Sequence, residues 1–371
     1  MRRAISTQKL APFAFAVLLS SSVAVAQRGY IPYEGNNAVV YEGSNGQIYE
    51  LYLSSTGWHL LELSLLAGAP PAFTWDPFGD ALPFVRTDQI NAVVYVGNNL
   101  HIYELFQLPG FSWQFEDLTN AGALEAAGNP APYIRSDGVN SVVYKARYDT
   151  DIHEASYSPR AGRWLDRNLS SLSGAPPGRD PHPYVRSDAF NSIVYRGLNS
   201  HIYEIFLVPG GAQYGDLTDY AGAPIAGSDP HPYVRSDAVN SVVYKGYFDN
   251  HIYELFLSWD GWHYGDLTYY SGAPLPASNP HPYVRFDGFN SVVYRGLDNH
   301  IYELFLSWDG WHYGDLTYYS GAPLGDVGST VHPYVRSDGV DSVVYSSGGR
   351  ITEIYLLDGW HYGDLSAQAG G

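Results

Sequence analysis

The sequence predicts an all-β protein, a seven-bladed β-propeller with four antiparallel strands per blade and a repeat of about 50 residues. Three observations predict this fold. One motif recurs seven times, every unit has four short segments rich in β-branched and aromatic residues, and only one connection per unit is long. The motif is Asn37-Ala38-Val39-Val40-Tyr41 in the first unit, and it begins again at Asn91, Asn140, Asn191, Asn240, Asn290 and Asp341. The spacings are 54, 49, 51, 49, 50 and 51 residues.

The sixth unit shows the internal plan. Residues 282–287 (PYVRFD) are expected to form strand A, 291–295 (SVVYR) strand B, 300–307 (HIYELFLS) strand C and 311–317 (WHYGDLT) strand D. Short turns rich in Gly, Asp and Asn join A to B, B to C and C to D. A long connection leads from strand D to the next unit. A four-stranded meander with one long return is typical of a propeller blade, and no stretch shows a helical period.

The first 26 residues are expected to be a signal peptide, and residues 27–371 a single propeller domain. Arg2, Arg3 and Lys9 give a basic start, a short apolar stretch follows, and Ala24-Val25-Ala26 is a small-x-small cleavage site. The mature protein is therefore expected to be secreted or periplasmic, with a retained amphipathic anchor as the alternative. Blade boundaries are expected near residues 79, 129, 180, 229, 279 and 330. The terminal blades are expected to close the ring by packing, without a shared blade.

The charge and composition exclude several classes of partner. Removal of residues 1–26 leaves 17 Lys and Arg against 38 Asp and Glu, a formal charge of −21. Nucleic acid is not an expected partner, because its phosphates demand a basic surface. Membrane insertion is not expected either, because no later segment approaches 18 apolar residues. Cysteine is absent, so disulfides and thiolate-bound metals cannot contribute. No cofactor is expected, and the oligomeric state is left open.

A glutamate stands in strand C of every unit, and an arginine stands in strand A of six units. The glutamates are Glu50, Glu104, Glu154, Glu204, Glu254, Glu303 and Glu353, and the arginines are Arg86, Arg135, Arg186, Arg235, Arg285 and Arg336, with Pro32 in the first unit. A carboxylate among apolar strand neighbours needs a partner. Symmetric hairpins set Arg285 opposite Ser291, and Ser291 opposite Glu303. The Arg, Ser and Glu side chains would then form one row on one face of the blade. This row is expected to be either a structural ion pair or a polar clamp for a ligand.

A tryptophan begins strand D in six units, with Ala212 in the fourth: Trp58, Trp113, Trp164, Trp262, Trp311 and Trp360. Each is interpreted either as a packing residue between blades or as a flat apolar platform at a pocket wall. Two further tryptophans, Trp259 and Trp308, stand beside Asp-Gly turns. Packing explains a turn tryptophan less readily, so these two are interpreted as functional.

Histidines recur before the Pro-Tyr of strand A and at the start of strand C. The histidines before Pro-Tyr are His182, His231, His281 and His332. Those at the start of strand C are His101, His201, His251 and His300. Hydrogen-bonded strand-end histidines are preferred over a ring of metal ligands, because no tight ligand spacing is present. The sequence also contains no nucleophile elbow, phosphate-binding loop or EF-hand loop.

The pattern Ser-Val-Val-Tyr, turn, Ile-Tyr-Glu, turn, Gly-Trp resembles the repeat of fucose-binding β-propeller lectins. In that family each sugar lies between adjacent blades, held by an Arg, a Glu and aromatic residues. Glu303 matches the family Glu, and Trp311 matches a family aromatic. Two positions depart from the pattern, since the family Arg on strand B is Ser291 here and the next family aromatic is Val293. Those lectins usually have fewer blades.

These features favour a multivalent carbohydrate-binding protein, a lectin with equivalent sites between blades and glycans or glycoconjugates as partners. Repetition of the same groups around the ring argues against an enzyme, because catalysis needs differently tuned groups at one place. Linked weak sites instead gain avidity on a surface that carries many ligand copies. The alternatives are an extracellular protein-interaction scaffold and, less favoured, a propeller hydrolase or lactonase.

Overall fold

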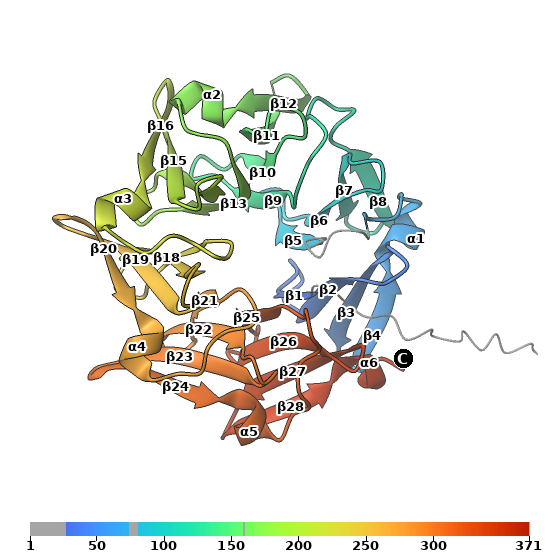
Figure 1. The fold of residues 1–371 in the computed structure, drawn as a ribbon. Coiled ribbons are helices and arrows are strands. Elements are labelled where there is room, and N and C mark those ends of the chain that lie inside the picture. Colours follow the sequence, from blue (N-terminus) through green and yellow to red (C-terminus); the bar gives the residue numbers. More distant parts are fainter. Residues whose placement is uncertain (1–26, 74–80, 159, 371) are drawn as a thin grey trace, which may run out of the picture.

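The computed structural model describes residues 27–73, 81–158 and 160–370 of the chain. The proposed signal peptide lies outside these residues. The described chain forms seven four-stranded antiparallel sheets, each from four consecutive strands in the order A-B-C-D, which confirms the seven-bladed propeller. Figure 1 shows the blades in a ring, with the first strand of each blade toward the centre and the fourth at the rim.

The strands of blades 1 to 4 are β1 (Gln27–Tyr30), β2 (Ala38–Glu42), β3 (Ile48–Ser54) and β4 (Gly57–Glu62); β5 (Leu82–Val85), β6 (Asn91–Val96), β7 (Ile102–Gln107) and β8 (Trp113–Asp117); β9 (Ala131–Ile134), β10 (Asn140–Lys145), β11 (Ile152–Ser158) and β12 (Arg163–Asn168); and β13 (Gly178–Val185), β14 (Asn191–Gly197), β15 (Ile202–Val208) and β16 (Gly211–Asp216). The strands of blades 5 to 7 are β17 (His231–Val234), β18 (Asn240–Lys245), β19 (Ile252–Ser258) and β20 (Gly261–Asp266); β21 (His281–Val284), β22 (Asn290–Arg295), β23 (Ile301–Ser307) and β24 (Gly310–Asp315); and β25 (Val331–Val335), β26 (Asp341–Ser347), β27 (Arg350–Leu356) and β28 (Trp360–Asp364).

Short helices follow strand D, which the sequence analysis did not predict. They are α1 (Leu63–Ala67), α2 (Leu169–Ser173), α3 (Leu217–Ala221), α4 (Leu267–Ser271), α5 (Leu316–Ser320) and α6 (Leu365–Gln368). In blade 6 the expected strand D ran to residue 317, but the strand ends at Asp315. The Asp315 side chain accepts a hydrogen bond from the backbone N–H of Tyr318 and so caps α5. Within the described residues, none of these helices has the length or apolarity that a membrane-spanning helix requires.

The strand register differs from the expected one by two residues. Ser291 lies opposite Tyr283 and Phe305, and Glu303 lies opposite Val293. The prediction that Ser291 pairs with Arg285 and Glu303 was therefore wrong. Because the error is an even number of residues, the same side chains still share one face of the blade. Arg285 itself lies beyond the end of β21, where its N–H donates to the carbonyl of Phe289 across the A–B turn.

The hydrophobic core is divided among the seven interfaces between neighbouring blades. At the interface of blades 6 and 7, Ile301 and Tyr283 of one blade pack with Tyr345, Ile354 and Trp360 of the next. The register places Ile301 on the same strand face as Glu303, and Trp360 on the strand face opposite Glu353. The glutamate-bearing face of each blade thus packs against the tryptophan-bearing face of the next.

The same hydrogen bond recurs at all seven interfaces between neighbouring blades. The side-chain oxygen of the first residue of the repeated motif accepts from a backbone N–H in the A–B turn of the preceding blade, at 2.7–3.0 Å. The acceptors are Asn91, Asn140, Asn191, Asn240, Asn290, Asp341 and Asn37, and the Asn37 bond comes from Ser337 of the last blade. This bond explains why the motif begins with Asn or Asp.

The ring closes through the same contacts that join the other blades. Asn37 and Ser337 form the interblade hydrogen bond, and Trp58 packs with Tyr334 and Ile351 in a shared cluster. Gly29 of β1 lies against Tyr334, and a Cβ at this position would be 2.2 Å from the ring. These contacts agree with the expected closure by packing, with no blade shared.

We predict that Asn37→Ala destabilises the protein as much as Asn290→Ala does. Each change leaves a turn N–H without its acceptor, which costs about 1–3 kcal/mol when the group is buried. Denaturant unfolding of both variants measures this. If Asn290→Ala lowers the unfolding midpoint and Asn37→Ala does not, the first and last blades are not joined as the neighbouring blades are.

Candidate functional site

The strand-C glutamate is buried in every blade. Its exposed fraction is between 0 and 5 % in all seven units. In six blades a strand-A tyrosine donates its hydroxyl proton to Oε1 of this glutamate, at 2.5–3.1 Å. The pairs are Tyr30–Glu50, Tyr133–Glu154, Tyr184–Glu204, Tyr233–Glu254, Tyr283–Glu303 and Tyr334–Glu353. The sequence analysis missed these tyrosines, although the Pro-Tyr step in most strand-A segments was the signal that could have revealed them.

The strand-A arginine contacts the glutamate in all six blades that have it, as the sequence analysis expected. The Nη1–Oε2 distances are 3.3–3.7 Å. Each arginine also has a second partner, which the sequence analysis did not predict. It is the aspartate two residues later, whose carboxylate lies 2.8–2.9 Å from Nη2 of the arginine. The arginines are 13–17 % exposed and these aspartates 42–51 %. The row therefore runs from a buried carboxylate through an arginine to a carboxylate in solvent.

Two blades depart from this arrangement. Blade 1 has Pro32 in place of the arginine, and a hollow of about 300 Å³ borders Glu50 there, with Tyr52, Asn91 and Gln107 in its wall. Blade 2 has Phe84 in place of the tyrosine. As a result, Oε1 of Glu104 is buried without a hydrogen-bond partner, although its Oε2 accepts from Arg86 at 3.3 Å.

Burial disfavours the charged form of these carboxyl groups. Loss of water raises the pKa of Glu50, Glu104 and Glu303 to about 7, and in Glu104 and Glu303 the arginine partly opposes the increase. The pKa is also raised in Glu204, Glu254 and Glu353. A group of this kind suits a structural role inside the interface better than direct contact with a ligand.

The strand-D tryptophans lie at the blade interfaces. Trp58, Trp113 and Trp164 are buried, and Trp262, Trp311 and Trp360 are partly buried against the adjacent core clusters. A glutamate and a tryptophan meet across an interface and not within one blade, because they occupy opposite faces of their own blade. This geometry matches the packing interpretation. Trp259 and Trp308 are instead 95 % and 96 % exposed at the tips of C–D hairpins.

A second hollow, of about 560 Å³, lies between blades 3 and 4. Blade 3 supplies Arg135, Asp137 and Arg167, and blade 4 supplies Leu207 and the following turn residues 208–211. This is the interface at which Ala212 replaces the strand-D tryptophan. Both interface hollows thus lie beside the strand-C glutamate position, at Glu50 and next to the Glu154 row.

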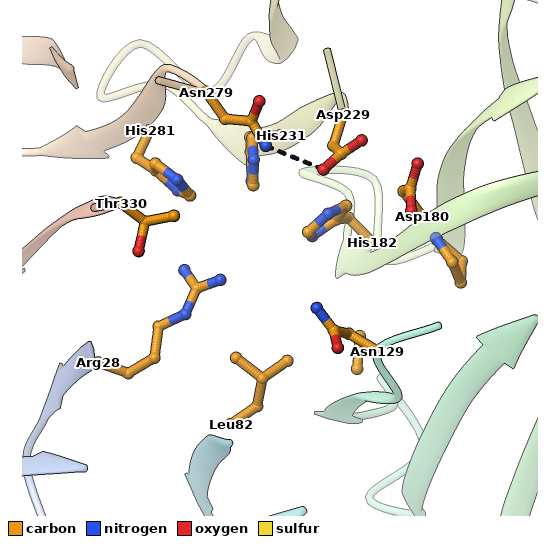
Figure 2. A pocket seen from close by; sticks show the side chains of 12 residues that line it. Arg28, Leu82, Asn129, Asp180, His182, Asp229, His231, Asn279, His281 and Thr330 are labelled. Atoms are coloured by element: carbon orange, nitrogen blue, oxygen red, sulfur yellow. Dashed lines mark hydrogen bonds between the residues drawn. The ribbon is translucent and has the colours of Figure 1, made fainter. Parts of the chain in front are cut away.

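The two sets of histidines have different surroundings. At the start of strand C, Nδ1 of His101, His201, His251 and His300 lies 2.7–2.8 Å from an aspartate, as expected of hydrogen-bonded strand-end histidines. Three of the strand-A histidines, His182, His231 and His281, instead line a central cavity of about 40 Å³ together with Arg28, as Figure 2 shows. Nε2 of His231 and of His281 has no hydrogen-bond partner there. For these two, the expectation of satisfied histidines was wrong.

The central histidines stack on one another. Ring centroids are 4.4 Å apart for His182 and His231, 4.0 Å for His231 and His281, and 4.2 Å for His281 and His332. Burial and neighbouring positive charge lower the pKa of His182 to about 4 and the pKa of the other three well below the usual value. Among the described residues, no group of three or more His, Asp or Glu is arranged to hold a metal ion.

We predict that Phe84→Tyr stabilises blade 2 and that Tyr283→Phe, the matched reverse change, destabilises blade 6. The first gives the unpaired Oε1 of Glu104 the donor that six blades already have, and the second removes it. A hydrogen bond to a charged or partly charged group contributes about 1–3 kcal/mol. Denaturant unfolding should move the two midpoints in opposite directions, and unchanged midpoints in both variants would contradict the role assigned to the tyrosines.

We also predict that His281→Leu makes the protein less sensitive to acid. The unfolded chain takes up protons at histidine below about pH 6.5, whereas burial and neighbouring positive charge hold the pKa of His281 well below its usual value. The central histidines therefore contribute stability that is lost as pH falls from 6.5 toward 4. The buried glutamates act in the opposite direction between about pH 4.5 and 7, so the variant must be compared with the parent protein.

Blade 2 has Leu82 at the position of His281, so leucine fits this site in the ring. Melting temperatures at pH 7, 6 and 5 are the measurement. The loss of melting temperature on acidification should be smaller in His281→Leu. Equal losses in the two proteins would show that the stack does not govern acid stability.

No protein-family model matches the chain, and no curated protein sequence matches it. Among solved structures, it is similar to the lectin BP39L from Burkholderia pseudomallei, with 12 % identity over 92 % of this chain and 98 % of that one and a TM-score of 0.65. It is also similar to AofleA from Arthrobotrys oligospora, with 14 % identity over 80 % and 88 % of the two chains and a TM-score of 0.53. The chain therefore shares a β-propeller fold with a known lectin, in agreement with the resemblance of its repeat to fucose-binding propeller lectins.

Proposed function

We propose that this protein is a lectin that binds glycans in grooves between neighbouring blades. The observation that carries the proposal is the position of the hollows at the interfaces of blades 1 and 2 and of blades 3 and 4. The hollow between blades 3 and 4 borders the row of charged residues that recurs around the ring, and the hollow between blades 1 and 2 borders Glu50 and Glu34, where Pro32 replaces the arginine of the row. Their volumes, about 300 and 560 Å³, fall within the range of small-molecule sites.

The exposed half of the row is suited to sugar hydroxyls. In this proposal the strand-A arginine donates to the sugar, the aspartate two residues on accepts from it, and the buried glutamate and tyrosine hold the arginine in place. Charge-assisted hydrogen bonds of this kind are short and strong. Aromatic rings lie beside the arginine in several blades: Arg285 is 5.6 Å from the Phe289 ring and Arg336 is 5.6 Å from the Tyr355 ring. An aromatic face next to polar groups is a surface against which a sugar ring can pack.

The same features support a binding protein over an enzyme. The row repeats with nearly the same geometry from blade to blade, so it offers several similar sites and no single place with differently tuned groups. A chain with such sites gains avidity on a surface that displays many glycans. From the predicted signal peptide, we further propose that the chain is exported and that the mature protein begins at Gln27.

A protein-interaction scaffold is the second candidate, and the exposed tryptophans favour it. Trp259 and Trp308 occupy the C–D hairpin tips of adjacent blades, and Leu357 stands in the corresponding hairpin of blade 7 with 63 % exposure. An exposed apolar row of this kind often contacts another protein.

We predict that Asp287→Asn removes one glycan site without lowering the melting temperature. Asp287 is 43 % exposed, and an exposed ion pair contributes only about 0–1 kcal/mol. The number of sites is measured by calorimetry, with a monosaccharide that a glycan array first identifies. A monosaccharide avoids the avidity that would hide the loss of one site.

Asp298→Asn is the matched control. Asp298 is exposed at the B–C turn and accepts a hydrogen bond from the Tyr302 hydroxyl, but it is not part of the row. It should leave the number of sites unchanged. The lectin proposal fails if no glycan binds to the parent protein. The scaffold is favoured instead if a protein partner is found whose binding requires Trp259 and Trp308.

A further inference from the structure

The groove between blades 3 and 4 differs from the other interfaces in shape. Blade 4 has Ala212 where six units have tryptophan, and its C–D hairpin is built from Pro209, Gly210 and Gly211. A hollow of about 560 Å³ lies between the two blades, and its wall includes Leu207, the strand partner of Ala212. Its wall is apolar on the side of Leu207 and Pro209 and charged on the side of blade 3.

The charge of this groove also differs from that of the others. Arg167 of β12 lies opposite Glu154, at the position where blades 4 to 7 have glycine. Its Nη2 donates to Oε2 of Glu154, and Nη1 of Arg135 lies 3.6 Å from the same oxygen. Two guanidinium groups therefore contact one buried carboxylate. In the other blades that have a strand-A arginine, this arginine is the one guanidinium that contacts the glutamate.

The part of the row that a ligand would meet carries one more positive charge here than in the other blades with a strand-A arginine. Glu154 is fully buried, so the exposed groups are Arg135, Arg167 and Asp137, with side-chain exposures of 17 %, 38 % and 51 %. In blades 2 and 4 to 7 the exposed part of the row is one arginine and one aspartate. In addition, Nε of Arg167 is buried and has no hydrogen-bond partner.

Blade 3 has a small excess of positive charge in an acidic protein. From the start of β9 to the end of β12, residues 131–168 contain six of the 20 Lys and Arg residues and five acidic residues, whereas the chain has a formal charge of −18. Arg163 is exposed and, four residues before Arg167, lies on the same face of β12. Such a local excess of positive charge attracts anions to this side of the ring.

We propose that this groove binds a saccharide that carries an anionic group, a carboxylate or a sulfate. Arg135 and Arg167 bind the anionic group, Asp137 accepts from a hydroxyl, and Leu207 and Pro209 contact the apolar face of the sugar. A guanidinium pair recognises the planar or tetrahedral oxygens of such groups through parallel hydrogen bonds. The inference rests on the proposed lectin function and assigns a ligand class to one of its sites.

The experiment measures binding to the full mature chain by calorimetry with three probes. They are a galacturonic acid trisaccharide, its methyl ester, and a sulfated galactose disaccharide. The free acid or the sulfated sugar should bind at one site per chain, and the methyl ester should bind at that site at least about tenfold more weakly because it lacks the charge. The affinity should fall as salt is raised. The two charged probes distinguish a carboxylate from a sulfate ligand.

Two variants test the groove by independent means. Arg167→Gln removes one guanidinium and should weaken binding of the charged probe about tenfold or more. Ala212→Trp restores the residue that six units have and should fill the groove, which abolishes the site with no loss of melting temperature. Arg163→Gln is the matched control, because Arg163 lies on the same face of β12 but is not part of the groove wall, and it should have a much smaller effect.

The outcomes separate this inference from the lectin proposal. Wild-type affinity for the charged probe in both Arg167→Gln and Ala212→Trp would overturn the inference. Binding of neutral glycans, with no binding of either charged probe, would overturn it and leave the lectin proposal in place. Absence of all glycan binding would remove both. Loss of charged-probe binding in Ala212→Trp, with neutral-glycan binding intact, would support it.

Discussion

The buried carboxylate of strand C is the constraint on which each blade interface depends. A carboxylate such as Glu303 cannot lie among Ile301, Val293 and Tyr283 unless other groups compensate for the loss of water. The tyrosine hydroxyl and the strand-A arginine do this from the same face of the blade. The arginine is therefore held at the edge of the interface, with its second side toward an exposed aspartate. A structural requirement inside the interface thereby fixes a polar group at its rim, where a ligand can reach it.

The repeat alone was sufficient to predict the fold, because seven equal units with one long connection each leave few other architectures. The same reasoning could not give the strand register. A hairpin folded about Gly288 can pair its strands in registers two residues apart without moving any side chain to the other face. Arg285, Tyr283 and Glu303 were for this reason assigned to the correct face and the wrong neighbours. The short helices were missed because one turn of helix after Asp315 is too brief to show a period.

The candidate site could be predicted only in part, for a physical reason. Glu303 and Trp311 are eight residues apart on one hairpin, and a pattern search groups them into one site. Alternation along the strands places them on opposite faces, so each meets a partner from a different neighbouring blade. The tyrosine that completes the row resembles an ordinary strand residue, and its role follows only from the 3.0 Å bond to Glu303. Sequence spacing identifies the members of such a site, but the packing of blade on blade decides which of them meet.

Positions that depart from the repeat can indicate function, because the repeated interface already provides hydrogen-bond partners for its own polar groups. Where Phe84 replaces Tyr, an oxygen of Glu104 is left unpaired, and the interface at which Ala212 replaces Trp contains a hollow. The first loss has no visible compensation. The second coincides with Arg167, a charged residue at a position that is glycine in four other blades. A change that removes packing on one side of a groove and adds a charge on the other is costly for stability alone, since it exposes apolar surface and partly buries a guanidinium. It becomes understandable if the groove has an occupant that supplies both the missing contact and a second negative charge beside that of Glu154.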